Sequence, residues 1–322
     1  MDRFATILDV ASKAGVSAST VSRAFNHPRL LRPETVQRIH DIAEDLGYIA
    51  NRHAKALSTG RAGAVGIVVP DITNPFFPPI IRQAQRVSEA MSYGVLVAES
   101  DNDPDREARQ IEQLIPQVDG LLLASPRQSE EALQRIASST RCVLLNRDVP
   151  GVARVLLSSR TALGTALGDL AAQGLSRVCY IGGPHRSWSN GERQEVVVRR
   201  AGELGMEVTV LHTTNGTYAE ARDLASDVLR VRAEVIIAFD DVVAHGVLDG
   251  VLAAGVRVPD EARLLGCDDA LPIQTHPRLS TIDMHGAPGV DRAMRMLLEA
   301  PGHPVPEERV VLQGVLQYRE TT

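Results

Sequence analysis

Hydrophobic residues in the first fifty positions recur at helical spacing in three groups. The groups are Val10, Ala11 and Ala14, then Val21, Ala24 and Phe25, and finally Val36, Ile39, Ile42, Ala43 and Leu46. Apolar residues three and four positions apart lie on one side of an α-helix, so this segment is expected to form three short amphipathic helices. Gly15 lies between the first two and predicts a tight turn there.

From Gly63 onward the pattern changes to short, continuous apolar runs separated by amphipathic stretches. The nine runs cover residues 64–69, 94–98, 120–124, 142–145, 155–157, 178–181, 208–211, 235–239 and 264–267. Continuous Val/Ile/Leu runs alternating with helices are typical of parallel sheets covered on both faces. Because nine strands exceed one small sheet, we predict two doubly wound lobes that meet near residues 158–161. Residues 279–284 and the helix 290–299 are expected to cross back to the first lobe.

Composition excludes several classes of protein. The chain has 322 residues, of which 44% are hydrophobic, and no apolar run approaches the roughly 18 residues of a membrane span. Met1 to Phe4 do not begin a signal peptide, so we expect a cytoplasmic protein with no membrane partner. Cys142, Cys179 and Cys267 each lie in an apolar run and are expected to be reduced core thiols.

The motifs of common enzymes are missing from the sequence. Neither lysine, Lys13 or Lys55, lies in a phosphate-binding GxxxxGK[ST] loop, and no HExxH or GxSxG motif occurs. Asp268 and Asp269 are adjacent, and adjacent side chains in an extended chain point to opposite sides. We therefore expect no catalytic residue, no metal and no cofactor.

Charge is distributed unevenly along the chain. The formal net charge is −6, but residues 1–62 carry nine Lys or Arg and six Asp or Glu, so this head has a net charge of +3 and the remainder −9. A basic module joined to an acidic body is typical of a nucleic-acid-binding head fused to another domain.

Residues 6–23 have the pattern of a helix-turn-helix. Ala11 is small enough for the helix crossing, Gly15 provides the turn, and Val16 and Val21 fill the core. Thr6 and Ser17 are expected to cap the two helices. The outward residues of the second helix are Ala18, Ser19, Ser22 and Arg23. Such a helix places its N-terminal residues in the major groove, where arginine binds guanine bidentately. The alternative is a helical hairpin without a partner.

Residues 47–61 form a short basic segment that contains Leu57. One interpretation is a linker. The other is a hinge helix that folds on DNA and inserts Leu57 into the minor groove.

Several motifs together resemble the LacI (lactose repressor) family of bacterial transcriptional regulators over essentially the whole chain. They are residues 6–26, 52–57, 66–77 (GIVVPDITNPFF), 119–120, 181–184 (IGGP) and 266–269 (GCDD). The resemblance implies a homodimeric repressor that reads a pseudo-palindromic double-stranded operator. It also implies a periplasmic-binding-protein-like core that binds a small-molecule effector between two lobes. Since no leucine heptads follow the last strand, we expect a dimer rather than a tetramer.

The expected domains are an all-α helix-turn-helix head (1–50), a hinge (51–62) and a two-lobed α/β core (63–322). The first lobe is expected to comprise about 63–158 and 286–312, and the second about 159–285 and 313–322.

The resemblance assigns base reading to Ala18, Ser19 and Arg23. It assigns contacts with the DNA backbone to Thr6, Ser17, Thr20, Ser22 and Asn26. In the hinge, the residues expected at the minor groove are Asn51, Ala54, Lys55 and Leu57, although Ala50 departs from the proline that is usual before this helix.

Ligands of two-lobed parallel sheets bind where the carboxyl ends of strands converge. The residues expected to bind the effector there are Asp71, Asn74, Phe76, Ser125, Asn146, Arg147, Trp188, Arg193, Asp240 and Asp268, and Arg127 and Asn190 lie on the same loops. Arg193 and Asp268 match effector-binding positions of the family. Asp240 replaces a more usual Asn, with Asp241 as the expected helix cap, and Trp188 is expected to stack on a sugar face.

Asp and Asn suit sugar hydroxyls, whereas Arg147 and Arg193 suit a carboxylate or phosphate. A sugar or sugar acid is therefore the expected effector, with a nucleoside or purine as the alternative. More remote alternatives are a solute-binding module and an enzyme on an α/β scaffold.

Overall fold

The computed structural model describes residues 5–26, 28–48, 61–271, 276–299 and 304–322. The chain divides into two compact units, Met1–Gly63 and Ala64–Thr322, which we describe separately. Within these ranges, every helix is too short or too polar to span a bilayer.

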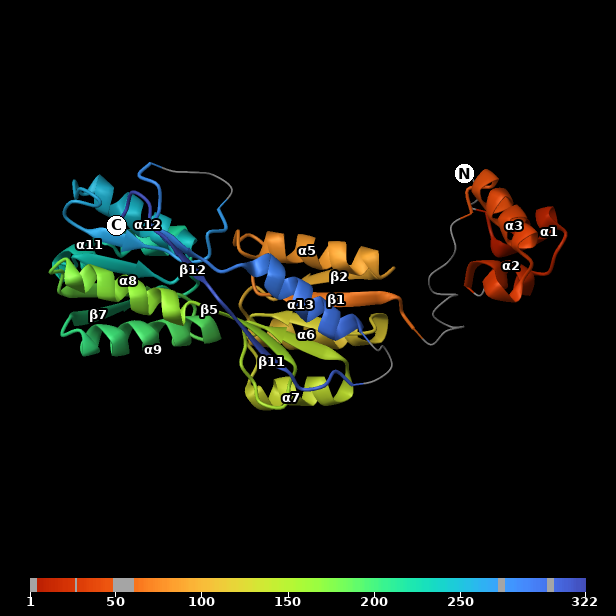
Figure 1. The fold of residues 1–322 in the computed structure, drawn as a ribbon, viewed down its shortest axis with the longest axis horizontal. Coiled ribbons are helices and arrows are strands. Elements are labelled where there is room, and N and C mark those ends of the chain that lie inside the picture. Colours follow the sequence, from red (N-terminus) through yellow and green to blue (C-terminus); the bar gives the residue numbers. More distant parts are fainter. Residues whose placement is uncertain (1–4, 27, 49–60, 272–275, 300–303) are drawn as a thin grey trace. The chain divides into compact units, whose positions relative to one another are not determined.

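The first unit contains the three predicted helices. They are α1 (Ile7–Ala14), α2 (Ala18–Asn26) and α3 (Pro33–Asp45), with a 3-10 turn η1 (Pro28–Leu30) between the last two (Figure 1). Val10, Val21 and Ile39 are fully buried where the helices meet. Their positions confirm the helical periodicity of the sequence.

Local signals fix the boundaries of these helices as expected. Thr6 and Asp9 form a reciprocal capping box at the start of α1. Gly15 ends α1 with φ of +64°, a left-handed conformation that glycine adopts without steric cost. Ser17 Oγ accepts the N–H of Thr20 at 3.2 Å and so caps α2.

The first lobe of the second unit is built on a six-stranded parallel sheet, in the order β2-β1-β3-β4-β5-β11. The strands are β1 (Ala64–Val69), β2 (Gly94–Glu99), β3 (Leu121–Ala124), β4 (Cys142–Leu145), β5 (Arg154–Ser158) and β11 (Arg309–Gln313). The helices are α5 (Phe77–Ala90), α6 (Pro104–Leu114), the 3-10 turn η2 (Ile115–Gln117), α7 (Glu130–Ser139) and α13 (Gly286–Leu298). Val65 and Ile67 of β1 face the core with α5 and α13, and Val68 faces the core with α6 and α7. The centre of the sheet is thus covered on both faces, which is why β1, β3 and β4 are continuously apolar and buried.

The second lobe repeats this arrangement on a smaller parallel sheet, in the order β7-β6-β8-β9. The strands are β6 (Arg177–Gly182), β7 (Glu207–His212), β8 (Val235–Ala238) and β9 (Arg263–Leu265). The helices are α8 (Arg160–Ala172), α9 (Trp188–Glu203), α10 (Tyr218–Asp223), α11 (Ala225–Arg230) and α12 (Asp241–Ala253). Tyr180 faces the core with α8 and α9, and Ile181 faces the core with α10 to α12. All nine predicted strands are present, and the prediction of two doubly wound lobes is confirmed.

The chain passes between the lobes at three places (Figure 1). The first follows β5, the second leads from β10 (Thr281–Asp283) into α13, and the third leads from β11 into β12 (Val315–Gln317). β10 pairs antiparallel with β12, and a bridge from Leu265 to Ser280 places its segment beside β9. α13 packs on α5, so the expected crossing of the helix back to the first lobe is confirmed. Residues 279–284, which were expected to cross with it, instead stay beside β9 in the second lobe.

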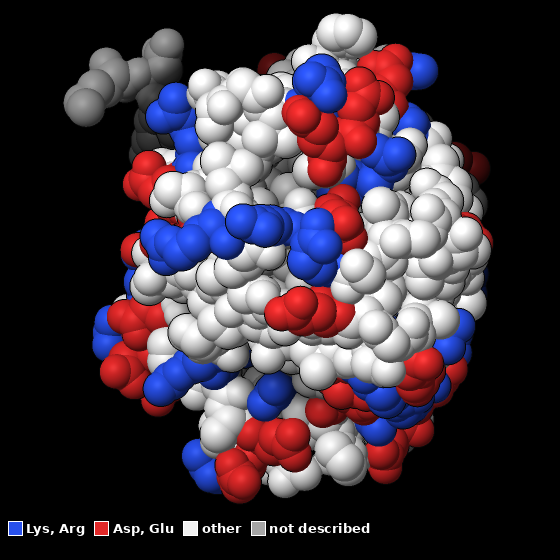
Figure 2. Space-filling model, turned by 90° about the vertical axis from the view of Figure 1, so that its left-hand side faces the viewer, with Lys and Arg blue, Asp and Glu red and all other residues white. Residues whose placement is uncertain are grey.

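Cys142, Cys179 and Cys267 are buried and free, as predicted. Burial raises the pKa of the Cys142 and Cys179 thiols to about 12, so both stay protonated and unreactive at neutral pH. On the end of this unit that carries the second lobe, basic and acidic side chains are interspersed (Figure 2).

Candidate functional site

The exposed face of α2 presents the predicted DNA-reading residues. Ser19 and Arg23 are exposed, and Ala18, Thr20 and Ser22 are partly exposed. Ser17 Oγ lies 2.8 Å from both the Ser19 and Thr20 hydroxyls, so a cluster of hydroxyl groups surrounds the helix N-terminus. A helix N-terminus surrounded by hydroxyl groups suits a phosphate oxygen. Base reading and phosphate contact stay predictions.

The remaining predicted DNA contacts are at the end of α2 and in the hinge. Asn26 is the last residue of α2. The hinge residues Asn51, Ala54, Lys55 and Leu57 lie outside the described residues.

In the second unit, the carboxyl ends of strands from both lobes converge on one small cavity of about 40 Å³. Eight of the predicted effector residues line it: Asp71, Asn74, Phe76, Ser125, Asn146, Arg193, Asp240 and Asp268. We call this space the cleft. The convergence follows from topology, because each of these loops follows a parallel strand or begins the next helix.

Unusual backbone conformations aim several of these side chains. Ser125 (φ +48°), Asn146 (φ +56°) and Asp268 (φ +117°) have positive φ values directly after or near the ends of β3, β4 and β9. Positive φ is uncommon for residues with a Cβ and clusters at functional sites. Asn146 Oδ1 also accepts the N–H of Leu157 at 2.9 Å, which fixes its amide at the cleft wall.

Asn74 and Asp240 connect the two lobes across the cleft. Asn74 Nδ2 donates to Asp240 Oδ2 at 3.0 Å, while Asn74 Oδ1 accepts the N–H of Phe76 at 3.0 Å. Asp240 Oδ1 accepts the N–H of Val243 at 2.8 Å, so both polar atoms of each of the two side chains are hydrogen-bonded.

The expectation that Asp241 caps α12 is therefore wrong. Asp240 has the extended backbone of an N-cap residue and makes the capping bond, and Asp241 is the first helical residue. The Asp241 carboxylate turns inward and accepts the hydroxyl of Thr281 at 2.6 Å.

The buried guanidinium of Arg193 lies near the carboxyl groups of Asp268 and Asp240 in the second lobe. Arg193 donates to Asp268 Oδ1 at 3.1 Å and to the carbonyl of Phe239, and it lies 5.0 Å from the centre of the Phe239 ring. Arg193 is 4% exposed and the Asp268 side chain 8%, and Asp240 and Asp241 are equally buried.

This crowding of acids has an electrostatic consequence. Burial raises the pKa of Asp240, raises that of Asp241 well above its usual value, and raises that of Asp268 to about 7 although Arg193 opposes the change. Raised pKa values mean that negative charge is unfavourable at this place, so an anion is disfavoured in the cleft and a neutral ligand that forms hydrogen bonds is favoured.

Arg127, by contrast, forms part of the cleft wall. Its guanidinium donates to the carbonyl of Ser125 at 2.8 Å and to Asn102 Oδ1 at 2.9 and 3.2 Å. Glu107 accepts the backbone N–H of Arg127 at 3.0 Å. Asn190 is likewise internal, because its Oδ1 accepts the hydroxyl of Tyr180 at 3.0 Å and the N–H of Gly183 at 2.9 Å.

Trp188 and Arg147 do not line the cleft, and the prediction that placed them there is wrong. Both line a second cavity of about 800 Å³. Ser187 Oγ accepts the N–H of Asn190 and so caps α9, which makes Trp188 the first residue of the helix. Ser189 and Arg193 consequently face the cleft, and Trp188, one residue away on the helix, faces the second cavity. Arg147 follows Asn146 and lines the second cavity, with its Nη2 3.5 Å from the carbonyl of Gln128.

Sequence reasoning missed several residues of the cleft. They are Pro70, Phe77, Asn102, Pro184, Ser187, Ser189, Asn215 and Phe239. Phe239 directly follows β8, so the carboxyl-end rule could have identified it. Within the described ranges, no three His, Cys, Asp or Glu residues are placed to hold a metal ion.

Comparison with known proteins agrees with this architecture. Residues 6–51 match the family of bacterial regulatory proteins of the lacI type, and residues 167–322 match the periplasmic binding protein-like domain. Catabolite control protein A of Staphylococcus xylosus is 26% identical over 98% of this chain and 99% of its own length. Among solved structures, the lac repressor dimer bound to operator and the anti-inducer ONPF has a TM-score of 0.88 at 20% identity, covering 99% of both chains.

A second solved structure is a LacI family regulator from Arthrobacter sp. FB24 in complex with lactose. It is 25% identical, has a TM-score of 0.69, and covers 80% of this chain and 99% of its own.

The lacI-type family consists of transcriptional regulators rather than enzymes. Given its lacI-type helix-turn-helix head and its periplasmic-binding-protein-like core, the chain belongs to the LacI family and is a DNA-binding transcriptional regulator.

Proposed function

We propose that a neutral sugar binds in the cleft and controls the affinity of this regulator, acting as a repressor, for its operator. The observation that carries the proposal is the Asn74–Asp240 hydrogen bond, which spans a cavity lined by polar side chains of both lobes. Sugar hydroxyls donate and accept hydrogen bonds, so they can replace this contact with bonds to each lobe.

The volume of the cleft supports a closed starting state. At about 40 Å³ it is far below the roughly 300–1,000 Å³ of small-molecule sites. A sugar therefore enters only when the lobes separate, which breaks the Asn74–Asp240 bond. Ligand binding is therefore coupled to the separation of the two lobes.

Electrostatics favours a neutral sugar over a sugar acid here. Arg127, which also lines the cleft, donates to Asn102 and to the carbonyl of Ser125. The acids Asp240 and Asp268 share Arg193, which already pairs with Asp268 at 3.1 Å. A carboxylate ligand would add negative charge to this group. The Arthrobacter regulator with bound lactose is a neighbour that accords with a neutral sugar.

A nucleoside or purine is the second candidate effector. Phe76 and Phe239 line the cleft and present flat apolar rings, on which a base could stack. A purine has fewer hydrogen-bond donors than a sugar, so it would bond to fewer of the carboxylates that line the cleft.

On the DNA side, we infer that Ala18, Ser19 and Arg23 read base edges. The backbone contacts are assigned to Thr6, Ser17, Thr20, Ser22 and Asn26. The hinge, residues 51–62, connects this head to the first lobe along the chain, and it is assigned to the minor groove through Leu57. Two heads of a homodimer would read the two halves of a pseudo-palindromic operator, as the lac repressor dimer bound to operator exemplifies.

A thermal-shift screen with neutral sugars, sugar acids and purines tests the effector class. The proposal predicts that a neutral sugar raises the melting temperature of the core and that the rise disappears in Asp240→Ala. Stabilisation by purines with no response to any neutral sugar would favour the second candidate instead.

A further inference from the structure

The second cavity lies at the junction of the two lobes and is large enough for a ligand. Its volume of about 800 Å³ falls within the range of small-molecule sites. β5 and β11 contribute one wall, and α9 contributes another with the residues at helical positions i, i+3, i+4 and i+7, which are Trp188, Gly191, Glu192 and Glu195. This cavity is separate from the cleft, since no residue lines both.

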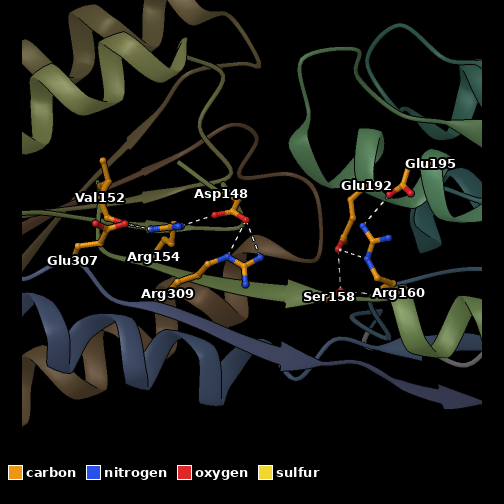
Figure 3. Close-up of polar contacts among 9 residues, drawn as sticks. All are labelled: Asp148, Val152, Arg154, Ser158, Arg160, Glu192, Glu195, Glu307 and Arg309. Atoms are coloured by element: carbon orange, nitrogen blue, oxygen red, sulfur yellow. Dashed lines mark hydrogen bonds and ion pairs between the residues drawn. The ribbon is translucent and has the colours of Figure 1, made fainter. Parts of the chain in front are cut away.

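Most charges around this cavity are paired with one another (Figure 3). On the first-lobe side, Asp148 accepts from Arg154 and, at 2.8 and 3.0 Å, from Arg309. On the other side, Arg160 donates to Glu195 at 2.8 Å and lies 3.7 Å from Glu192. Glu192 also accepts the hydroxyl of Ser158 at 2.9 Å.

Arg147 differs from these residues. Its one hydrogen bond within the described part of the chain is a long one, 3.5 Å from Nη2 to the carbonyl of Gln128, and its buried Nε has no partner there. A buried N–H without an acceptor is unfavourable, so a ligand that offers one would stabilise this guanidinium.

Trp188 contributes a flat apolar surface to the same cavity. It is the single tryptophan of the chain, lies at the first position of α9 and is half-buried. An indole that is partly open to a cavity can stack against a ring, and its fluorescence would report on occupancy of the cavity.

We propose that this cavity is a second ligand site, which binds a small ring-shaped carboxylate with its ring against Trp188 and its carboxylate on Arg147. The planar guanidinium fork matches a carboxylate in shape and charge. A singly charged group suits the site, because Glu192 and Glu195 also line the cavity and would repel the second charge of a phosphate.

The site joins the lobes as well as holding the ligand. Arg147 follows β4 of the first lobe, and Trp188 begins α9 of the second. A ligand that contacts both residues favours one spacing of the lobes, independently of whether the cleft binds a sugar.

Tryptophan fluorescence of the full-length protein tests the proposal. D-Glucuronate and cyclohexanecarboxylate are the ring-shaped carboxylate probes, D-glucose is the neutral comparison, and D-glucose 6-phosphate is the dianion. We expect a saturable change with at least one carboxylate probe, a weaker or absent response to D-glucose, and weaker binding of the phosphate. Arg147→Gln should weaken carboxylate binding about tenfold or more, as expected for a lost charged hydrogen bond.

Two controls separate this site from general effects. Arg186→Gln makes the same change two residues from Trp188, on an exposed side chain that lines neither cavity, and should leave the affinity within about twofold. Arg193→Gln alters the cleft and should leave the fluorescence response to the carboxylate unchanged. Failure of the sugar proposal for the cleft would therefore be distinguishable from failure of the proposal for this second site. No saturable response to either carboxylate, an unchanged affinity in Arg147→Gln, or tighter binding of the phosphate would each overturn the proposal. Circular dichroism establishes that each variant is folded.

Discussion

Asn74 and Asp240 face each other across the cleft, with Nδ2 of the amide 3.0 Å from Oδ2 of the carboxylate. Asn74 belongs to the loop after β1, and Asp240 caps α12, so the contact joins an element of each lobe. Because Asp240 is 2% exposed, the bond is shielded from water and its loss leaves a buried carboxylate without this donor.

Asn74→Asp should destabilise the closed core, because two carboxylates would then meet. We expect the free energy of unfolding at pH 7.5 to fall by about 1–3 kcal/mol, measured by urea denaturation. The double variant Asn74→Asp/Asp240→Asn exchanges donor and acceptor and keeps an N-cap residue at 240. It should recover most of the loss. If the double variant loses as much as the two single variants together, the two side chains are not coupled.

Asp241→Asn should stabilise the core, and increasingly so as the pH rises. Burial and the neighbouring Asp268 raise the pKa of Asp241 well above its ordinary value near 3.8. The native state therefore holds this proton at pH values where the unfolded chain has lost it, and ionised Asp241 lowers stability as the pH climbs from about 4. Asparagine keeps an oxygen for Thr281 without the charge.

We expect the stability difference between Asp241→Asn and the parent to be near zero at pH 4 and about 1 kcal/mol or more at pH 7.5. Denaturant titrations at several pH values measure it. A difference that does not vary with pH would show that ionisation of Asp241 is not the cause.

Arg23→Ala should reduce sequence discrimination by the head. Arg23 is exposed on α2 and is assigned to base edges, so its loss should weaken binding to a selected operator by about 1–3 kcal/mol. Binding to random duplex DNA should weaken much less. Arg38→Ala removes an equally exposed arginine from α3 and is the matched control. Equal losses on both DNAs in Arg23→Ala would remove its base-reading role.

Leu57→Ala tests the hinge assigned from the sequence. A leucine wedge in the minor groove unstacks bases at a cost of about a few kcal/mol, and the bent DNA offsets this cost by contacting more of the protein. Removing the wedge should therefore lower both operator affinity and the bend angle of the DNA. Ser58→Ala, one residue further, should change neither. Unchanged affinity and bend in Leu57→Ala would leave a linker as the better interpretation.

Strand positions and the general site of the cleft were predictable because they depend on local pattern and topology. Val65 and Ile67 belong to a continuous apolar run, and such runs form buried parallel strands in this fold. The residues around Trp188 were harder, because a shift of one residue in where a helix starts turns a side chain by about 100°. Ser187 sets that start, so Ser189 faces the cleft in place of the predicted Trp188.

The capping of α12 shows the same limit. Asp240 and Asp241 are identical in type and adjacent, and only the extended backbone at Asp240 decides which one caps. The pair of Asn74 with Asp240 depends on how the two lobes close. The pair of Arg193 with Asp268 depends on how distant segments of the second lobe pack together, and no local pattern encodes either contact.

The most direct test of the account is operator affinity measured against ligand concentration. A sugar found to stabilise the core would be titrated into full-length protein bound to a labelled operator, with fluorescence anisotropy as the signal. The account predicts a change in operator affinity of about 5- to 150-fold, equivalent to a coupling of about 1–3 kcal/mol. This change should be lost in Asp240→Ala. A sugar that saturates the cleft and stabilises the core but leaves operator affinity unchanged would contradict the central claim.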